Sequence, residues 1–204
     1  EGHNEVQNGV WRPWGPDVLL GEEVNGASLG IIGFGRIGKA VARRAAGFGI
    51  KLYYHDPYRD TEYEQAHNVN YLELDDLLQT CDFITIHISL SEATYHLIDA
   101  PQFAMMKSNA ILINTSRGGV VNPAALYDAL KNRQIRSAAL DVFEPEPIPA
   151  DHPILNLDNL ILTPHIASAS TRTRQLMAIM AAENLIAGLK NEKLPHCANS
   201  AVYH

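Results

Sequence analysis

The amino-acid sequence predicts a doubly wound α/β fold, in which helices cover both faces of a parallel sheet. Short apolar runs recur along the chain without the polar alternation of a half-exposed strand, which is typical of strands buried on both faces. Segments with helical periodicity separate these runs. Because strand and helix alternate repeatedly, the order favours a parallel sheet joined by crossover helices.

The apolar runs predict six strands. They occupy residues 29–33, 51–55, 83–87, 111–115, 138–142 and 160–163. After the first strand, apolar residues at helical spacing predict a helix over residues 37–48. Further helices are expected at residues 74–78, from Pro123 onward, and over about 171–189.

The ends of the chain differ from its middle. Residues 1–27 are rich in glycine and contain Pro13 and Pro16, so we expect an irregular arm. Residues 28–168 hold the strand and helix pattern and are expected to form the main domain, followed by a helix and tail at 169–204. Four prolines between residues 145 and 153 predict a rigid loop after the fifth strand.

Composition excludes several classes of protein. The 204 residues carry a net charge of -7, which argues against nucleic acid or an acidic membrane as the main partner. No apolar window is long enough for a membrane span, and no signal peptide is expected. Cys81 and Cys197 form no disulfide framework, which favours a reducing cytoplasmic location. The histidines lack metal-ligand spacing, so no metal is predicted.

A glycine-rich motif, Gly33-Phe34-Gly35-Arg36-Ile37-Gly38, follows the first strand and opens the next helix. In this context the motif is typical of a Rossmann-type dinucleotide site, whereas alone it would also fit a turn without a ligand. Gly33 would make the tight turn, Gly35 would let the pyrophosphate approach, and Gly38 would permit close packing. The helix N-terminus would then face the phosphates.

Asp56 ends the second strand, where an acidic residue accepts hydrogen bonds from the ribose hydroxyls of NAD. A solvated aspartate heading a turn with Pro57 is the alternative. NAD is therefore the expected cofactor, while Arg59 nearby leaves NADP open.

Three more segments place polar residues after strands, where open α/β sheets bind ligands. They are residues 114–119 (Asn-Thr-Ser-Arg-Gly-Gly), 140–147 (Leu-Asp-Val-Phe-Glu-Pro-Glu-Pro) and 163–168 (Thr-Pro-His-Ile-Ala-Ser). With these motifs in order, the whole chain resembles the D-2-hydroxyacid dehydrogenase family. The resemblance implies an oxidoreductase whose catalytic residues are Arg117, Glu146 and His165. It also implies a set of cofactor-contacting residues: Gly33, Gly35, Arg36, Ile37, Gly38, Asp56, Thr115, Asp141 and Ser168.

The chemistry suits these residue types. The planar guanidinium of Arg117 can hold the carboxylate of a 2-keto acid and bond its carbonyl oxygen. His165 can supply the proton to that oxygen after hydride arrives from the nicotinamide, and Glu146 would orient the imidazole and favour its protonated form.

Finer matches resemble the glyoxylate/hydroxypyruvate reductase branch. They are the arm segment 11–16, the pair Val121-Asn122 and residues 165–169, whereas Ser89 and Ala167 depart from the commoner family residues. The resemblance leaves alternatives open: a phosphoglycerate dehydrogenase-like enzyme, or a nucleotide-sensing corepressor of the same superfamily. Formate dehydrogenase fits less well, because it carries Gln where Glu146 stands.

Members of this family are longer and place a substrate domain before the dinucleotide domain. Residues 1–10 resemble the end of an interdomain helix, and residues 171–204 resemble the segment that returns to the substrate domain. We therefore expect a fragment that lacks the second wall of its cleft. The resemblance also implies a homodimer through the dinucleotide domain and the arm that bears Trp11 and Trp14.

Overall fold

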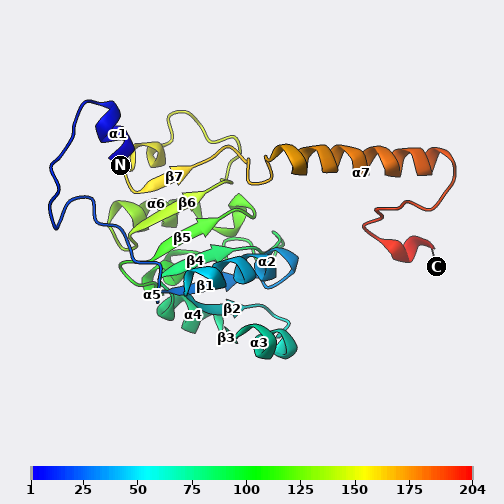
Figure 1. Cartoon of the computed structure of the whole chain (residues 1–204), viewed down its shortest axis with the longest axis horizontal. Coiled ribbons are helices and arrows are strands. Elements are labelled where there is room, and N and C mark those ends of the chain that lie inside the picture. Colours follow the sequence, from blue (N-terminus) through cyan, green and yellow to red (C-terminus); the bar gives the residue numbers. More distant parts are fainter. Residues whose placement is uncertain (1, 204) are drawn as a thin grey trace. The chain divides into compact units, whose positions relative to one another are not determined.

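The computed structural model describes residues 2–203, which form two compact units that meet in the chain between Leu162 and Thr163. The first unit contains a seven-stranded sheet with the strand order β3-β2-β1-β4-β5-β6-β7 (Figure 1). Every pair of neighbouring strands is parallel. The predicted doubly wound α/β fold is confirmed.

All six predicted strands are present, within two residues of their predicted ends. The strands are β1 (Ser28–Ile32), β2 (Lys51–His55), β3 (Val69–Tyr71), β4 (Phe83–Ile86), β5 (Ile111–Asn114), β6 (Ser137–Leu140) and β7 (Leu160–Leu162). The sequence did not predict β3, an edge strand of three residues that is too short to show a pattern.

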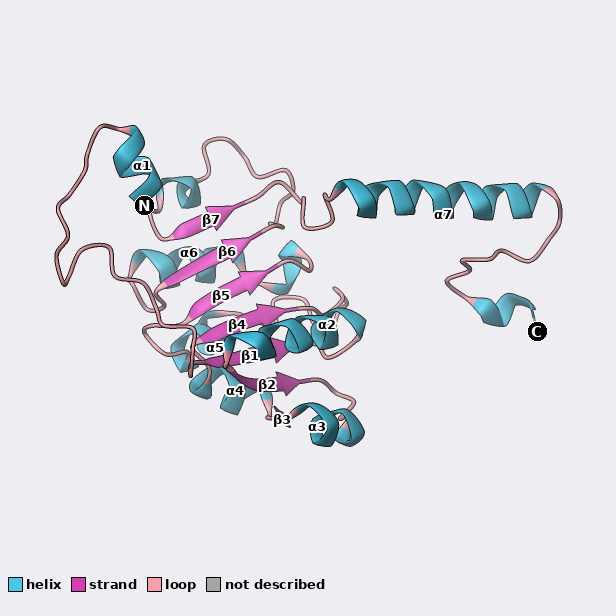
Figure 2. Ribbon diagram, in the orientation of Figure 1, coloured by secondary structure: helices cyan, strands magenta, loops and turns pink. Residues whose placement is uncertain are grey.

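Helices follow the predicted plan, with three additions. The helices are α1 (Gly2–Gln7), α2 (Arg36–Ala45), α3 (Thr61–His67), α4 (Leu74–Thr80), α5 (Ala100–Met105), α6 (Pro123–Lys131) and α7 (Thr171–Leu189) (Figure 2). The end of the first predicted helix is a 3₁₀ turn, η1 (Ala46–Phe48), which Gly49 terminates at a φ of 69°.

The unpredicted helices have local causes. Asp60 caps α3, since its carboxylate accepts a hydrogen bond from the amide of Tyr63. Asp99 and Gln102 form a capping box at the start of α5. The expectation from composition that residues 1–27 are irregular was wrong for α1, whereas the resemblance of residues 1–10 to the end of an interdomain helix agrees with it. The run from Gly2 to Gln7 is free of the helix-breaking prolines that follow it.

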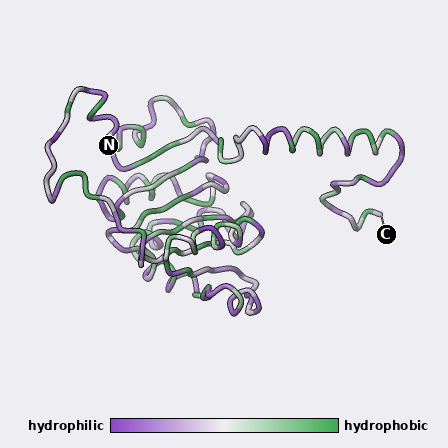
Figure 3. The backbone as a smooth tube through the Cα atoms, viewed as in Figure 1, coloured by the Kyte–Doolittle hydropathy of each residue, from purple (hydrophilic) through white to green (hydrophobic). Residues whose placement is uncertain are grey.

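The two faces of the sheet carry different helices. An added Cβ at Gly30 would lie 2.5 Å from the side chain of Leu77 in α4, whereas the side chain of Ile31 lies 3.2 Å from the Cβ position of Gly38 in α2. Because successive residues of a strand point to opposite faces, α2 and α4 cover opposite faces. Each face has its own apolar core, and hydrophobic residues concentrate along the strands between them (Figure 3).

The arm before β1 is attached to the sheet through Arg136. The guanidinium of Arg136 donates to the carboxylate of Glu22 at 2.6 Å and to the carbonyl of Leu20 at 2.7 Å. Trp11 and Trp14 are 82% and 91% exposed. The arm therefore presents two large aromatic side chains to its surroundings.

The second unit consists of α7 and a tail that folds back on its end. Ser170 caps α7 by accepting a hydrogen bond from the amide of Thr173, and Asn184 bonds both the amide and the carbonyl of His196. Among the helices of residues 2–203, none combines the length and apolar composition that a membrane crossing requires.

Candidate active site

The turn between β1 and α2 depends on two glycines. Gly33 has a φ of 93°, and its amide donates to the carbonyl of His55 at 2.9 Å. An added Cβ at Gly38 would lie 2.1 Å from the carbonyl oxygen of Gly33, a distance that no side chain tolerates. The tight turn therefore needs Gly33 for its backbone conformation and Gly38 for its close approach.

Gly35 lies in open space instead. An added Cβ there would meet no atom within 4 Å, so the fold by itself does not require this glycine. Arg36 and Ile37, the first residues of α2, are exposed beside it. Amides in the first turn of a helix lack intrahelical partners and attract anions. A glycine facing open space at this helix end fits the approach of a pyrophosphate, so the residues present suit a dinucleotide.

Asp56 lies at the carboxyl end of β2 and is held by two backbone amides. One carboxylate oxygen accepts from Phe34 at 2.8 Å and the other from Tyr58 at 2.9 Å. Each oxygen keeps a lone pair for a further donor. A surface groove of about 610 Å³ runs past this carboxylate. The groove is lined by Phe34, Gly35, Lys39, Asp56, Tyr58, Arg59, Asp60, Thr61 and Glu62.

Two ion pairs border this groove, and sequence analysis missed both. Lys39 pairs with Asp60, and the pKa of Asp60 is lowered chiefly by its hydrogen bond from Lys39. Arg59 pairs with Glu64 at 2.8 Å, and this contact is the main cause of the lowered pKa of Glu64. The sequence offered one signal for the pair of Arg59 and Glu64. Arg59 follows Asp56 after β2, and the next helix, α3, carries acidic residues in its first turn.

The turn after β5 positions Arg117. The side chain of Asn114 donates to the carbonyl of Arg117 at 3.0 Å and accepts from both the amide and the hydroxyl of Ser116. Arg117 itself is exposed and directly precedes the 3₁₀ turn η2 (Gly118–Val120). Thr115, which opens this turn, is also exposed. The backbone of Arg117 is thus fixed by Asn114, and its guanidinium donates to the carbonyl of Ser116 at 2.7 Å.

The loop that bears Glu146 lies against this turn. An added Cβ at Gly118 would lie 2.1 Å from the carbonyl oxygen of Phe143, so only glycine permits the contact. The amide of Asp141, a buried residue, donates to the carbonyl of Asn114 at 2.9 Å. The segments carrying Arg117, Asp141 and Glu146 therefore meet at the carboxyl ends of β5 and β6.

A pair that sequence analysis did not predict joins these segments. The imidazole of His96 lies 3.0 Å from a carboxylate oxygen of Glu144, and the amide of His96 donates to the carbonyl of Gly119 at 2.8 Å. His96 has a φ of 51°, which turns its backbone toward η2. The pair links the loop before α5, the turn η2 and the loop after β6.

His165 and Ser168 belong to the second unit. The amide of His165 donates to the carbonyl of Thr163 at 3.0 Å, and its φ is 55°. Within the first unit, the structure brings together the segments that bear Arg117, Asp141 and Glu146. It also brings the glycine motif next to Asp56. The catalytic and cofactor roles assigned to all these residues stay predictions.

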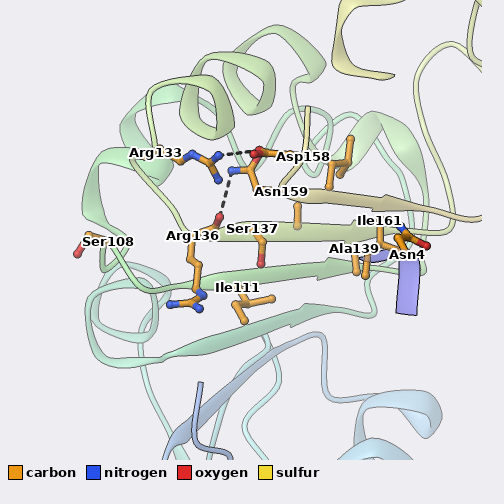
Figure 4. A pocket seen from close by; sticks show the side chains of 12 residues that line it. Asn4, Ser108, Ile111, Arg133, Arg136, Ser137, Ala139, Asp158, Asn159 and Ile161 are labelled. Carbon is orange, nitrogen blue, oxygen red and sulfur yellow. Dashed lines mark hydrogen bonds and ion pairs between the residues drawn. The ribbon is translucent and has the colours of Figure 1, made fainter. Parts of the chain in front are cut away.

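A second hollow, of about 790 Å³, lies at the amino ends of β5, β6 and β7 and extends along β6 and β7 to Ala139 and Ile161 (Figure 4). It contains Ile111, Ser137 and Leu160, which are the first residues of β5, β6 and β7. Its lining includes none of the predicted site residues. The candidate site is therefore at the carboxyl ends of the strands and not in this hollow.

Comparison with known proteins identifies the family. Residues 1–167 match the family model described as D-isomer specific 2-hydroxyacid dehydrogenase, NAD binding domain. The glyoxylate reductase of Korarchaeum cryptofilum is 50% identical over 203 residues, covering 99% of this chain and 61% of that protein. The glyoxylate/hydroxypyruvate reductase B of Citrobacter koseri is 45% identical over 199 residues, covering 97% and 61%.

Solved structures show the same fold. The crystal structure of the TT0316 protein from Thermus thermophilus superposes with a TM-score of 0.89 at 40% identity, covering 95% of this chain and 60% of that one. The chain thus spans about 61% of the length of the curated relatives that it matches.

Proposed function

The chain belongs to the D-isomer specific 2-hydroxyacid dehydrogenase family, as its NAD-binding domain, and from this premise we propose that it acts in hydride transfer between NADH and a small 2-keto acid. Glyoxylate and hydroxypyruvate are the substrates that the names of its relatives favour. The observation that carries the proposal is the meeting of the Arg117 turn and the Glu146 loop at the sheet edge that also holds the glycine motif.

Each proposed role follows from the chemistry of its side chain. Bound NADH supplies the hydride. Arg117, exposed at the end of β5, binds the substrate carboxylate through its planar fork and polarises the ketone. His165 donates the proton that the developing alkoxide requires, and Glu146 orients that imidazole. In the oxidative direction the same two residues remove the proton.

The nucleotide end of the site rests on the first unit alone. Gly33, Gly35 and Gly38 form the turn that receives the pyrophosphate, with Arg36 and Ile37 at the start of α2 beside it. Asp56 binds the ribose hydroxyls. Thr115, Asp141 and Ser168 complete the cofactor contacts, and Asp141 meets the nicotinamide carboxamide.

We further propose that the chain works as a homodimer and together with a substrate domain. Its relatives are longer than this chain by more than a third of their own length. A closed cleft excludes water and strengthens the electrostatic contacts of Arg117 and His165. Carboxylate binding and rapid turnover therefore require a second wall.

A chimera tests this function. The part of the Korarchaeum cryptofilum relative outside its matched region is joined to this chain, and NADH oxidation is followed with glyoxylate and hydroxypyruvate. We expect turnover by the chimera and much slower turnover by the 204-residue chain alone. His165→Ala in the chimera should lower turnover about 10²–10⁴-fold, while NADH affinity stays within about twofold.

His3→Ala is the matched control, because this exposed histidine lies in α1 and should leave turnover unchanged. A chimera that binds NADH and turns over neither substrate would favour a nucleotide-sensing protein instead. Near-normal turnover in His165→Ala would remove this residue from the mechanism.

A further inference from the structure

Arg59 raises a question that the position of Asp56 does not answer. Both residues line the groove at the end of β2. An arginine at this point of a dinucleotide fold can accommodate the 2′-phosphate of NADP, whereas an acidic residue there favours the free hydroxyl of NAD. Which nucleotide is bound therefore depends on whether the guanidinium of Arg59 is available.

The guanidinium of Arg59 donates two of its five N–H groups, those along one edge, to a single carboxylate. Its Nε donates to one oxygen of Glu64 and its Nη2 to the other, both at 2.8 Å. Such a bidentate pair is stronger and more directional than a single contact. The guanidinium carbon also lies 5.2 Å from the centre of the Tyr71 ring, which fixes its plane further. Arg59 is thereby oriented toward α3 and β3.

Glu64 is the fixed partner of this pair. Its side chain is 12% exposed, compared with 57% for Arg59. The hydroxyl of Tyr54 donates to the same Glu64 carboxylate at 2.8 Å and accepts from the amide of Asp60. The contact with Arg59 lowers the pKa of Glu64, so the carboxylate stays ionised at neutral pH. The hydrogen bond from the buried Tyr54 thus fixes the position of Glu64, and Glu64 in turn fixes the orientation of Arg59.

The second cation of the groove is neutralised in a similar way. Lys39 pairs with Asp60, whose other oxygen caps α3 through the amide of Tyr63. The ammonium of Lys39 also lies 5.2 Å from the Tyr63 ring. Since Glu62 lines the groove as well, the 2′-position of a bound adenosine would face an acidic surface with both cations occupied.

We propose that Glu64 is a specificity-determining residue: by sequestering Arg59 it withholds the ligand that a 2′-phosphate needs, and it thereby enforces the choice of NADH over NADPH. This inference rests on the proposed function, in that the groove beside Asp56 must receive the adenosine ribose. It assigns selectivity to a residue on α3 that does not itself line the groove.

Glu64→Gln tests the proposal in the 204-residue chain by nucleotide fluorescence titration, without any need for turnover. Glutamine keeps the size of the side chain and an acceptor for the Tyr54 hydroxyl, but it no longer holds Arg59 by charge. We expect NADPH to bind about tenfold more tightly, the equivalent of one added charge-assisted hydrogen bond, and NADH affinity to change less than about twofold.

Glu62→Gln is the matched control, because it removes the same charge from the same helix and borders the same groove. An equal gain in Glu62→Gln would mean that general charge, not release of Arg59, governs selectivity, and would overturn the proposal. An unchanged NADPH affinity in a folded Glu64→Gln chain would also overturn the proposal. Adding Arg59→Ala to Glu64→Gln should abolish the gain.

Arg59→Ala alone keeps the test decisive if Glu64→Gln fails to fold. Because Arg59 is sequestered, its removal should change NADPH affinity by less than about twofold, whereas a loss near tenfold would show that it already serves the phosphate. If the unaltered chain binds neither NADH nor NADPH, the cofactor site of the proposed function is wrong, and this outcome is distinct from binding without selectivity.

Discussion

Gly38 shows how one residue couples the fold to the site. An added Cβ at Gly38 would lie 2.1 Å from the carbonyl oxygen of Gly33. We therefore expect Gly38→Ala to lower the free energy of unfolding by about 2 kcal/mol, since a methyl group must displace either α2 or the turn. NADH affinity should fall with it, and both are measured by urea unfolding and fluorescence titration.

Gly47→Ala provides the comparison. Gly47 lies in the 3₁₀ turn η1, and an added Cβ there would meet no atom within 4 Å. Its substitution should change stability by less than about 1 kcal/mol. Equal losses in the two variants would contradict the view that the contact with Gly33, and not the change to alanine as such, limits position 38.

Single residues also show what sequence can predict about a site. Gly33, Asp56 and Arg117 were predicted as site residues because each follows the end of a strand, and the carboxyl ends of parallel strands share one edge. The pairs Arg59–Glu64 and His96–Glu144 were missed. Each joins side chains whose encounter depends on backbone geometry, such as the φ of 51° at His96, which has no sequence signature.

At the scale of elements, Asp82 links the start of β4 to the start of β1. Its carboxylate accepts from the amide of Ser28 at 2.9 Å, from the Ser28 hydroxyl at 2.6 Å and from Lys107 at 2.9 Å. Burial acts to raise the pKa of Asp82 and is the largest single influence, but the hydrogen bonds together outweigh it and lower the pKa well below its usual range.

Asp82→Asn should therefore lower the free energy of unfolding at pH 7 by about 2 kcal/mol. Because the folded pKa is depressed, the contribution of Asp82 is fully present above the unfolded value near 4 and is lost as the pH falls below it. The difference between Asp82→Asn and the unaltered chain should shrink between about pH 5 and pH 2 in urea unfolding curves.

Asp151→Asn, at an exposed position in the loop before β7, should leave both stability and its pH dependence unchanged. If Asp82→Asn keeps a constant deficit across the acid range, then shape and not charge explains its effect, and the assigned pKa direction would be wrong.

Elements differed in how clearly the sequence revealed them. Six strands and the 19-residue α7 were predicted within two residues of their ends, because apolar runs of strand length recur between helical segments and α7 is long and rich in strong helix formers such as alanine and leucine. α3 and α5, of seven and six residues, carry too few positions for a period. Their caps, Asp60 and Asp99, were the available signals, since a cap residue marks a helix start independently of helix length.

The whole molecule presents the exposed tryptophans of the arm as its clearest mark of association. Trp11 and Trp14, at 82% and 91% exposure, lie in the segment proposed to contact a second copy. Large aromatic side chains are enriched at interfaces, where burial stabilises association. We expect the 204-residue chain to sediment as a dimer and Trp11→Ser with Trp14→Ser to shift it to the monomer.

Phe48→Ser is the control for that experiment, because Phe48 is also an exposed aromatic residue, 64% accessible, but lies in η1 outside the arm. It should leave the sedimentation coefficient unchanged. A monomeric parent chain, or a dimer that persists without both tryptophans, would refute the proposed role of the arm. The proposed role of the arm rests on the family resemblance, and the exposure of both tryptophans supports it.

The strand order has a consequence for synthesis. β2 and β4 both pair with β1, and β5, β6 and β7 each pair with the strand made before them, as β3 pairs with β2. Every strand after β1 therefore leaves the ribosome when its neighbour already exists, and no strand must wait for a partner still to be translated. A sheet that grows outward from its first strand can assemble as fast as the chain is made, at roughly 5–20 residues per second, and among the described strands only the outer edges of β3 and β7 stay unpaired once the sheet is complete.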